Sequence, residues 1–220
     1  MLASDAYKLM NCYFDNEKRT LTDPTFLPIE DEKLKANPHR STVRFFMSFS
    51  FDGKRDATFM KVIIPLIDAA KHSVLLFSSI HTPTDEFTQA IERAIKRGVQ
   101  VTVLGNMRLF HLDIVCQGVL NVYYHLYNQL KATVFIWNNG SFLHSKMATF
   151  DEEISYIGSA NFDYRSQYLD SNCGCLILSK AVNHAIKQEF NNLSTQYHPY
   201  KPKSPSSWDK VQAIKHRSQY

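Results

Sequence analysis

The chain has 220 residues, hydrophobic and charged shares of 44% and 21%, and a formal net charge of +4. These values exclude disordered and fibrous classes and indicate a globular protein of one domain or two small ones. No apolar run reaches the roughly 18 residues of a membrane-spanning helix, and the first residues lack the basic start and apolar block of a signal peptide, so we expect a cytoplasmic protein.

The first 41 residues do not predict a domain of their own. Residues 7–19 favour a short helix, whereas residues 20–41 carry Pro24, Pro28 and Pro38 and show no sustained hydrophobic period. Such a segment is typical of a linker. We therefore interpret residues 1–41 as an N-terminal helix followed by a linker.

The next part of the chain alternates between strands and helices. Residues 42–50, rich in β-branched and aromatic side chains, predict a strand, and apolar residues at helical spacing over 56–71 predict a helix. A second strand over 73–80 leads into a helix over 82–98, for which we expect Thr82 to be the N-cap.

The alternation continues in the second half of the chain. The expected elements are a strand over 99–104, a helix within 112–130, a strand over 132–137, a hairpin of 142–150 and 154–158, a strand over 173–178 and a helix over 181–194. This pattern indicates an α/β fold with a mixed β-sheet flanked by helices, and we assign residues 42–195 to that domain.

Residues 196–220 form a basic tail that carries the whole net charge, with five basic residues against the single acidic Asp209. Its composition favours a solvated extension. The alternative is a tail that contacts an anionic lipid surface or a nucleic-acid backbone.

The four cysteines are Cys12, Cys116, Cys173 and Cys175, too few and too scattered for a disulfide scaffold. The last two lie in the apolar run 173–178, and no matching ligand pair stands elsewhere. We interpret them as small buried side chains rather than zinc ligands, and we expect neither a metal nor a cofactor.

The segment 142-FLHSKMATFDEEISYIGSANFDYRS-166 is the strongest candidate for a functional site. On a strand, His144 and Lys146 project from one face, and the hairpin is expected to bring Asp151, Ser159 and Asn161 into the same neighbourhood. A lysine, a histidine and neutral hydrogen-bond donors on a glycine-started loop suit a phosphate oxyanion.

The ordered pattern H-x-K-x4-D, six residues, then G-S-x-N resembles the phospholipase D superfamily motif. Residues 158–166 resemble the second such motif of bacterial cardiolipin synthases, and the resemblance covers roughly residues 42–195. It implies a metal-independent phosphodiesterase or phosphatidyltransferase that works through a phosphohistidine, with a phospholipid as substrate. A homodimeric nuclease of the same superfamily and a catalytically weak half-enzyme that needs a partner are the alternatives.

The resemblance also implies a role for each matching residue. His144 is then the nucleophile or the general acid, Lys146 and Asn161 bind phosphate oxygens, and Ser159 lines the same pocket next to Gly158. Asp151 completes the motif. In the family a glutamate that orients the histidine follows downstream, but the corresponding places here hold Asp170 and Asn172, which we expect to weaken catalysis unless Asp170 compensates.

The family's site needs two facing copies of the motif, and the chain contains a single H-x-K. A two-fold homodimer would supply the second copy. Alternatively, the chain is a second half whose first half is encoded separately, with residues 1–41 as the remnant of that half; residues 4–18 resemble the helix that follows the first motif, and we favour this interpretation. The sequence is compatible with either partner, a second copy of the chain or a separately encoded half. It is also compatible with a basic tail that contacts the surface of a membrane.

Overall fold

The computed structural model describes residues 41–49, 56–106, 113–137 and 139–200. These residues all belong to one unit, which begins at Pro38. The predicted helix over 7–19, the linker and the basic tail beyond Tyr200 lie outside the described residues.

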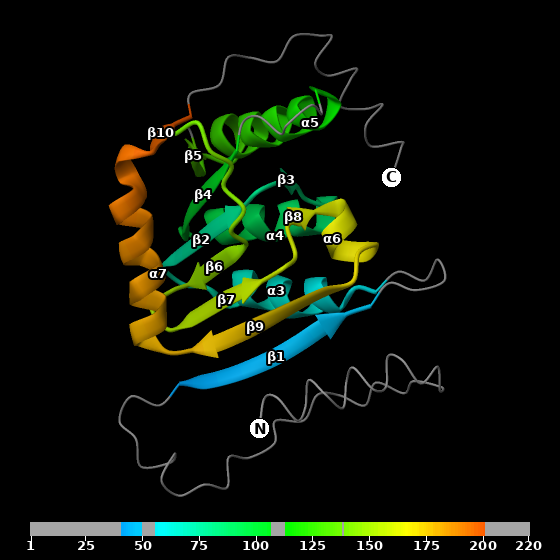
Figure 1. The fold of residues 1–220 in the computed structure, drawn as a ribbon, viewed down its shortest axis with the longest axis vertical. Helices are drawn as coiled ribbons and strands as arrows, with labels where there is room; N and C mark the ends of the chain where they lie inside the picture. Colours follow the sequence, from blue (N-terminus) through cyan, green and yellow to red (C-terminus); the bar gives the residue numbers. More distant parts are fainter. Residues whose placement is uncertain (1–40, 50–55, 107–112, 138, 201–220) are drawn as a thin grey trace, which may run out of the picture. The chain divides into compact units, whose positions relative to one another are not determined.

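Eight strands form one mixed sheet in the order β1-β9-β7-β6-β2-β4-β5-β10 (Figure 1). Strands β2, β4 and β5 are parallel, whereas the other neighbouring pairs are antiparallel. The strands are β1 (Thr42–Ser48), β2 (Ser73–Ser78), β4 (Gln100–Asn106), β5 (Thr133–Trp137), β6 (Met147–Phe150), β7 (Ile154–Gly158), β9 (Asn172–Leu178) and β10 (Tyr197–Pro199). A separate short pair consists of β3 (His81–Thr82) and β8 (Phe162–Asp163).

Helices cover both faces of the sheet, which confirms the predicted α/β class (Figure 1). One face packs against α3, α4 and α5, and the other packs against α7. The helices are α3 (Thr58–Ala69), α4 (Asp85–Lys96), α5 (Asp113–Tyr124) with the π-helical turn His125–Gln129, α6 (Tyr164–Tyr168), and α7 (Lys180–Asn192) with the 3-10 turn Leu193–Thr195.

Side chains of the central strand β2 alternate between two apolar cores. Val74 and Leu76 join the larger core, under α3, α4 and α5. Leu75 and Phe77 join the smaller core, in which Ile186 of α7 is also buried. Full burial of such a side chain contributes about 1.5–3 kcal/mol, so the apolar run of β2 is explained by a strand that is covered on both faces.

Helix α4 begins two residues later than the sequence analysis predicted. Its N-cap is Thr84, whose hydroxyl oxygen accepts a hydrogen bond from the Phe87 N–H. Thr82, the predicted cap, instead belongs to β3 and pairs with Asp163 of β8. A threonine is an effective cap at either place, so the long-range pairing with β8 decides which one is used.

The sheet also extends past residue 195, the predicted end of the domain. Residues Tyr197–Pro199 form β10, which pairs with β5 and buries the Tyr197 side chain. Pro199 lacks an N–H donor, but a proline is tolerated on an edge strand. The start of the basic tail is therefore part of the fold.

Candidate active site

The segments that carry the motif meet at one end of the sheet. Because β2, β6, β7 and β9 are successive antiparallel neighbours, the carboxyl ends of β2 and β7 lie beside the amino ends of β6 and β9. The carboxyl ends of the parallel strands β2 and β4 point the same way. This end of an α/β sheet commonly borders the ligand.

Lys146 is the buried cation of this end, with 8% of its surface exposed. Its Nζ donates to the Ser79 hydroxyl at 2.8 Å and to the main-chain oxygen of His144 at 2.7 Å. Burial lowers the pKa of Lys146, and the negative charge of Asp163 opposes that effect. An ammonium has three donors, and the described residues engage two of them, so one is left for an anion.

Two residues that the sequence analysis did not single out hold this arrangement together, Ser79 and Asn106. The Asn106 amide nitrogen donates to the main-chain oxygens of Ser79, at 3.0 Å, and Leu143, at 2.9 Å, and its Oδ1 accepts from the Leu143 N–H at 3.0 Å. Polar residues at the ends of two neighbouring parallel strands are the signal that would have identified them.

The sequence analysis expected His144 and Lys146 to lie on a strand, but in the structure both residues precede β6. β6 begins at Met147, where pairing with Phe77 and Ile157 begins, and the segment before it is held by Asn106 rather than by a β ladder. His144 is exposed, and its ring lies 5.8 Å from the Phe142 ring. None of the described residues hydrogen-bonds to the imidazole, so its nitrogens are accessible.

Asn161 lies at the same end of the sheet, where its side chain contacts Ser78, the residue that precedes Ser79. Its Oδ1 lies 3.2 Å from the Ser78 hydroxyl, which also accepts from the Phe162 N–H at 3.1 Å. The Ser78 hydroxyl shares its one proton between Asn161 Oδ1 and the Ile80 main-chain oxygen, which lies at 2.7 Å, and the amide nitrogen of Asn161 is the group that remains to donate to a ligand.

Gly158 and Ser159 complete the predicted phosphate loop. The Gly158 N–H donates to the Lys146 main-chain oxygen at 3.1 Å, and a Cβ at Gly158 would lie 2.3 Å from the Tyr156 hydroxyl, so only glycine fits. The Ser159 hydroxyl donates to Asn172 Oδ1 at 2.8 Å and accepts from the Cys173 N–H at 3.0 Å.

The two downstream residues, Asp170 and Asn172, contact their own loop rather than His144. Asp170 forms an ion pair with Arg165 at 2.9 Å. The Asn172 amide nitrogen donates to the main-chain oxygens of Ser166, at 3.2 Å, and Asp170, at 3.3 Å. Neither residue takes the place of the family's histidine-orienting glutamate in this conformation.

Asp151 is not in the neighbourhood that the sequence analysis assigned to it. It occupies the turn after β6, at the opposite end of that strand from Lys146, with a positive φ of 49°. Its carboxylate accepts hydrogen bonds from the N–H groups of Lys71, His72 and Ser73, at 2.7–3.2 Å. Partial burial acts to raise the pKa of Asp151, but these donors outweigh it and lower the pKa.

His81 is a buried structural histidine behind the site. Its ring stacks on Phe162 at 5.7 Å, and its Nε2 lies 3.2 Å from the Leu104 main-chain oxygen. Burial lowers the pKa of His81 to about 4, against the opposing effect of that hydrogen bond. The ring is therefore neutral at physiological pH.

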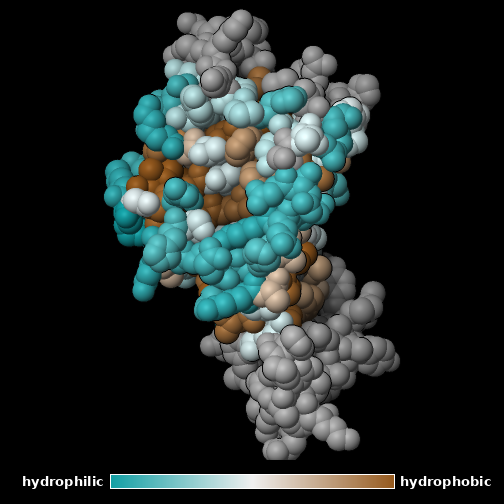
Figure 2. Space-filling model, turned by 90° about the vertical axis from the view of Figure 1, so that its left-hand side faces the viewer, coloured by the Kyte–Doolittle hydropathy of each residue, from teal (hydrophilic) through white to brown (hydrophobic). Residues whose placement is uncertain are grey.

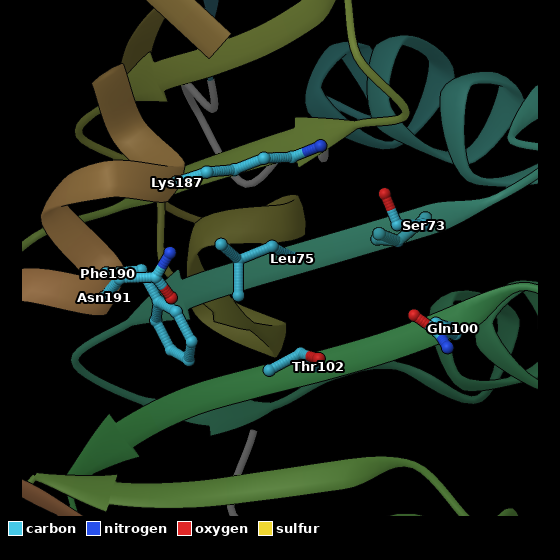
Figure 3. A pocket seen from close by; sticks show the side chains of 8 residues that line it. Ser73, Leu75, Gln100, Thr102, Lys187, Phe190 and Asn191 are labelled. Carbon is cyan, nitrogen blue, oxygen red and sulfur yellow. The ribbon is translucent and has the colours of Figure 1, made fainter. Parts of the chain in front are cut away.

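A shallow recess of about 200 Å³ lies between α7 and the strands β2 and β4 (Figure 3). Its lining includes Ser73 and Gln100, the first residues of those strands, so it opens at the end of the sheet opposite to Lys146. The Lys187 ammonium, also in its lining, already bonds to the Asp151 main-chain oxygen and to Glu152. We do not assign the candidate site to this recess.

The residues that the structure describes contain no group of three or more His, Cys, Asp or Glu side chains arranged to hold a metal ion. Their helices also include none with the length and apolar character that crossing a membrane requires.

Residues 63–194, more than half of the chain, match the family model described as "Cardiolipin synthase, PLD-like domain". Cardiolipin synthase 2 of Staphylococcus epidermidis is 30% identical over 129 residues, which are 59% of this chain and 26% of that protein. Cardiolipin synthase A of Buchnera aphidicola is 26% identical over 133 residues, 59% of this chain and 27% of that protein. The chain thus spans about a quarter of these curated relatives.

Solved structures show the same fold at low sequence identity. The phospholipase D family member Nuc from Salmonella typhimurium superimposes with a TM-score of 0.58 at 17% identity, over 74% of this chain and 100% of Nuc. Phosphatidylserine synthase from Haemophilus influenzae gives a TM-score of 0.63 at 14% identity, over 83% of this chain and 47% of that one.

Proposed function

The chain belongs to the family of cardiolipin synthase phospholipase D-like domains, and from that premise we propose that it is one half of a phosphodiester-processing enzyme. Its substrate is a phospholipid, which it cleaves by hydrolysis or by phosphatidyl transfer. The observation that supports this most is the buried Lys146 ammonium, which has one N–H donor that the described residues do not engage, close to the exposed imidazole of His144.

In the proposed reaction a ring nitrogen of His144 attacks the phosphorus atom. The bond between phosphorus and the leaving alcohol oxygen breaks, and a phosphohistidine remains. Water or a second alcohol then attacks the phosphorus and displaces His144. Lys146 and the Asn161 amide nitrogen bind the phosphate oxygens in both steps, which stabilises the negative charge by donors that are already in place.

A second histidine must protonate the leaving alcohol, and the chain has a single H-x-K motif. We propose that a separately encoded half supplies this second histidine. The alternative source is a second copy of this chain in a homodimer. The basic tail would hold the assembly at an anionic membrane surface.

The test is turnover by the purified chain on phosphatidylglycerol, phosphatidylcholine and single-stranded DNA, with the oligomeric state measured at the same concentration. We expect turnover of phospholipid, by the chain alone or with its partner half, that EDTA does not change. Acid-labile, base-stable phosphate on His144 should be trapped by rapid quenching. Inhibition by EDTA would contradict the mechanism.

The substrate panel also distinguishes the alternatives. Cleavage of DNA by a dimer, without action on lipid, would identify a homodimeric nuclease. A monomer that turns over phospholipid only after a second motif-bearing half is added is the result expected for a separate half. Weak turnover even then would identify a catalytically weak half-enzyme, for which Asn172 in the usual glutamate position gives a reason.

A further inference from the structure

Three sulfur-containing side chains lie together on the sheet, outside the candidate active site. In β9, Cys173 and Cys175 are two residues apart, so their side chains project from the same face. Met47 of β1 is the direct cross-strand partner of Cys173. Directly opposed residues of antiparallel strands have Cβ atoms about 4.5–5.5 Å apart.

The neighbouring residues establish which face this is. A Cβ on Gly174 would lie 2.5 Å from the Tyr156 ring and 2.9 Å from the Phe46 ring, so Gly174 faces the larger core. Phe46 is itself buried in that core. The residues next to them in sequence, Cys173, Cys175 and Met47, therefore point to the opposite face, the one on which α7 lies.

Helix α7 does not cover the three sulfurs, because it packs farther along the sheet, on Leu75 and Phe77 of β2. Cys173 is exposed, and Cys175 and Met47 are half-buried, so the interpretation of both cysteines as buried side chains was wrong. Figure 2 views the molecule from the side on which α7 lies in Figure 1 and shows hydrophobic residues at the surface on either side of a hydrophilic band.

The spacing of the two thiols suits a bridging ion better than a disulfide. Their Cα atoms lie about 6.7 Å apart, twice the rise of a strand residue, with parallel side chains. A disulfide needs Cβ atoms about 3.8 Å apart. Two metal–thiolate bonds of about 2.3 Å span up to roughly 4.6 Å between the sulfurs, a separation that two cysteines leaning toward each other can reach.

We propose that Cys173, Cys175 and Met47 form a binding site for a soft monovalent metal ion, copper(I). Two thiolates and a thioether are the ligands that select copper(I) among the common metal ions. Zinc prefers four ligands and takes carboxylate or imidazole groups to complete them, and the described residues offer no such group here. Both thiols lose their protons when the ion binds.

The strands on either side of β9 supply the surroundings of this site. The cross-strand neighbours of Cys175 are Phe45 and Ile157, which give the site an apolar wall. The site does not depend on the proposed catalytic function.

The experiment is an anaerobic titration of the reduced full chain with copper(I), in competition with a chromophoric chelator. Because Cys12 and Cys116 are also thiols, the matched control is the double variant Cys12→Ser/Cys116→Ser, which should keep one tight copper(I) per chain. In that background, Cys173→Ser or Cys175→Ser should weaken binding by roughly 100-fold or more, and Met47→Leu by roughly tenfold.

X-ray absorption of the copper-loaded control should show three sulfur neighbours, and two in Met47→Leu. Unfolding of the metal-free variants, measured in parallel, shows whether they remain folded. Loss of binding in the Cys12→Ser/Cys116→Ser control, full retention in Cys173→Ser, or tighter binding of zinc than of copper(I) would overturn the proposal.

Discussion

The two ends of β6 carry the two parts of one sequence motif, and they have different surroundings. At the amino end, Lys146 is buried against Ser79 and His144 is exposed. At the carboxyl end, Asp151 ties its turn to the main chain that leads into β2. A compact motif therefore marks both a candidate site and the turn that fixes the strand behind it.

The surroundings also favour opposite ionisation states at the two ends of β6: the neutral form of the titratable groups at one end and the charged form at the other. Burial lowers the pKa of Lys146 and of His81 and raises that of Asp163, so the candidate site opposes the charged form of each group. At the other end, main-chain donors lower the pKa of Asp151 and favour its charged form. We expect substitutions at the first end to change activity and those at the second end to change stability.

The largest effect is expected for His144→Ala, which removes the proposed nucleophile. Turnover should fall by roughly 10⁴-fold or more, whereas the free energy of unfolding should change by less than about 0.5 kcal/mol because the ring is exposed. Initial rates and urea unfolding measure the two quantities. His184→Ala, on the exposed side of α7, is the control and should keep full turnover; equal activity of both variants would remove His144 from the mechanism.

The next effect is a loss of stability in acid that depends on His81. Its pKa is about 4 in the folded chain and 6.5 in the unfolded one. The unfolded chain therefore binds more protons between these values, and stability falls as the pH drops from 6.5 to 4, by about 3 kcal/mol. Urea unfolding across this range should show the slope in the wild type and a flatter profile in His81→Gln. An unchanged profile would assign the acid sensitivity to other groups.

Asp151→Ala tests the opposite end of β6. Removing the carboxylate leaves three main-chain N–H groups without their acceptor, and alanine is disfavoured at positive φ, so we expect a loss of about 2 kcal/mol. Asp151→Asn, which keeps one oxygen and tolerates this φ, should lose about half as much. Turnover per folded molecule should stay within about threefold. A folded but inactive Asp151→Asn would show that the two ends are not separate.

The smallest effect is expected for Asn172→Asp. The aspartate keeps an acceptor for the Ser159 hydroxyl but cannot donate to the main-chain oxygens of Ser166 and Asp170, which costs about 1 kcal/mol. Because Asn172 does not contact His144 here, turnover should change by less than about threefold. A large gain in rate would instead indicate that a carboxylate at this position reaches the histidine.

Much of the fold could be predicted from the sequence because its strands are apolar runs separated by turns. The strand β2 and the helix α7 lie within two residues of their expected limits. The short pair β3 and β8 was missed, since two-residue strands have no periodicity and form only through long-range pairing. The same pairing moved the N-cap of α4 from Thr82 to Thr84.

The candidate site was predictable in its residues but not in its geometry. The motif identified Lys146 and Asn161, yet their partners Ser79 and Ser78 lie far away in the sequence. The distance of Asp151 from Lys146 follows from the strand between them. Lys146 directly precedes β6 and Asp151 directly follows it, so the extended strand holds the two residues at its opposite ends.

The pairing of β1 with β9 has a consequence for the order in which the chain assembles. Thr42 pairs with Leu178, so the two strands are separated by more than half of the chain. The parallel strands β2, β4 and β5 follow one another closely and can pair while synthesis continues, because domains form early where contacts are local. During that time β1 has no partner in the sheet, and the growing chain carries an unpaired strand until β9 leaves the ribosome.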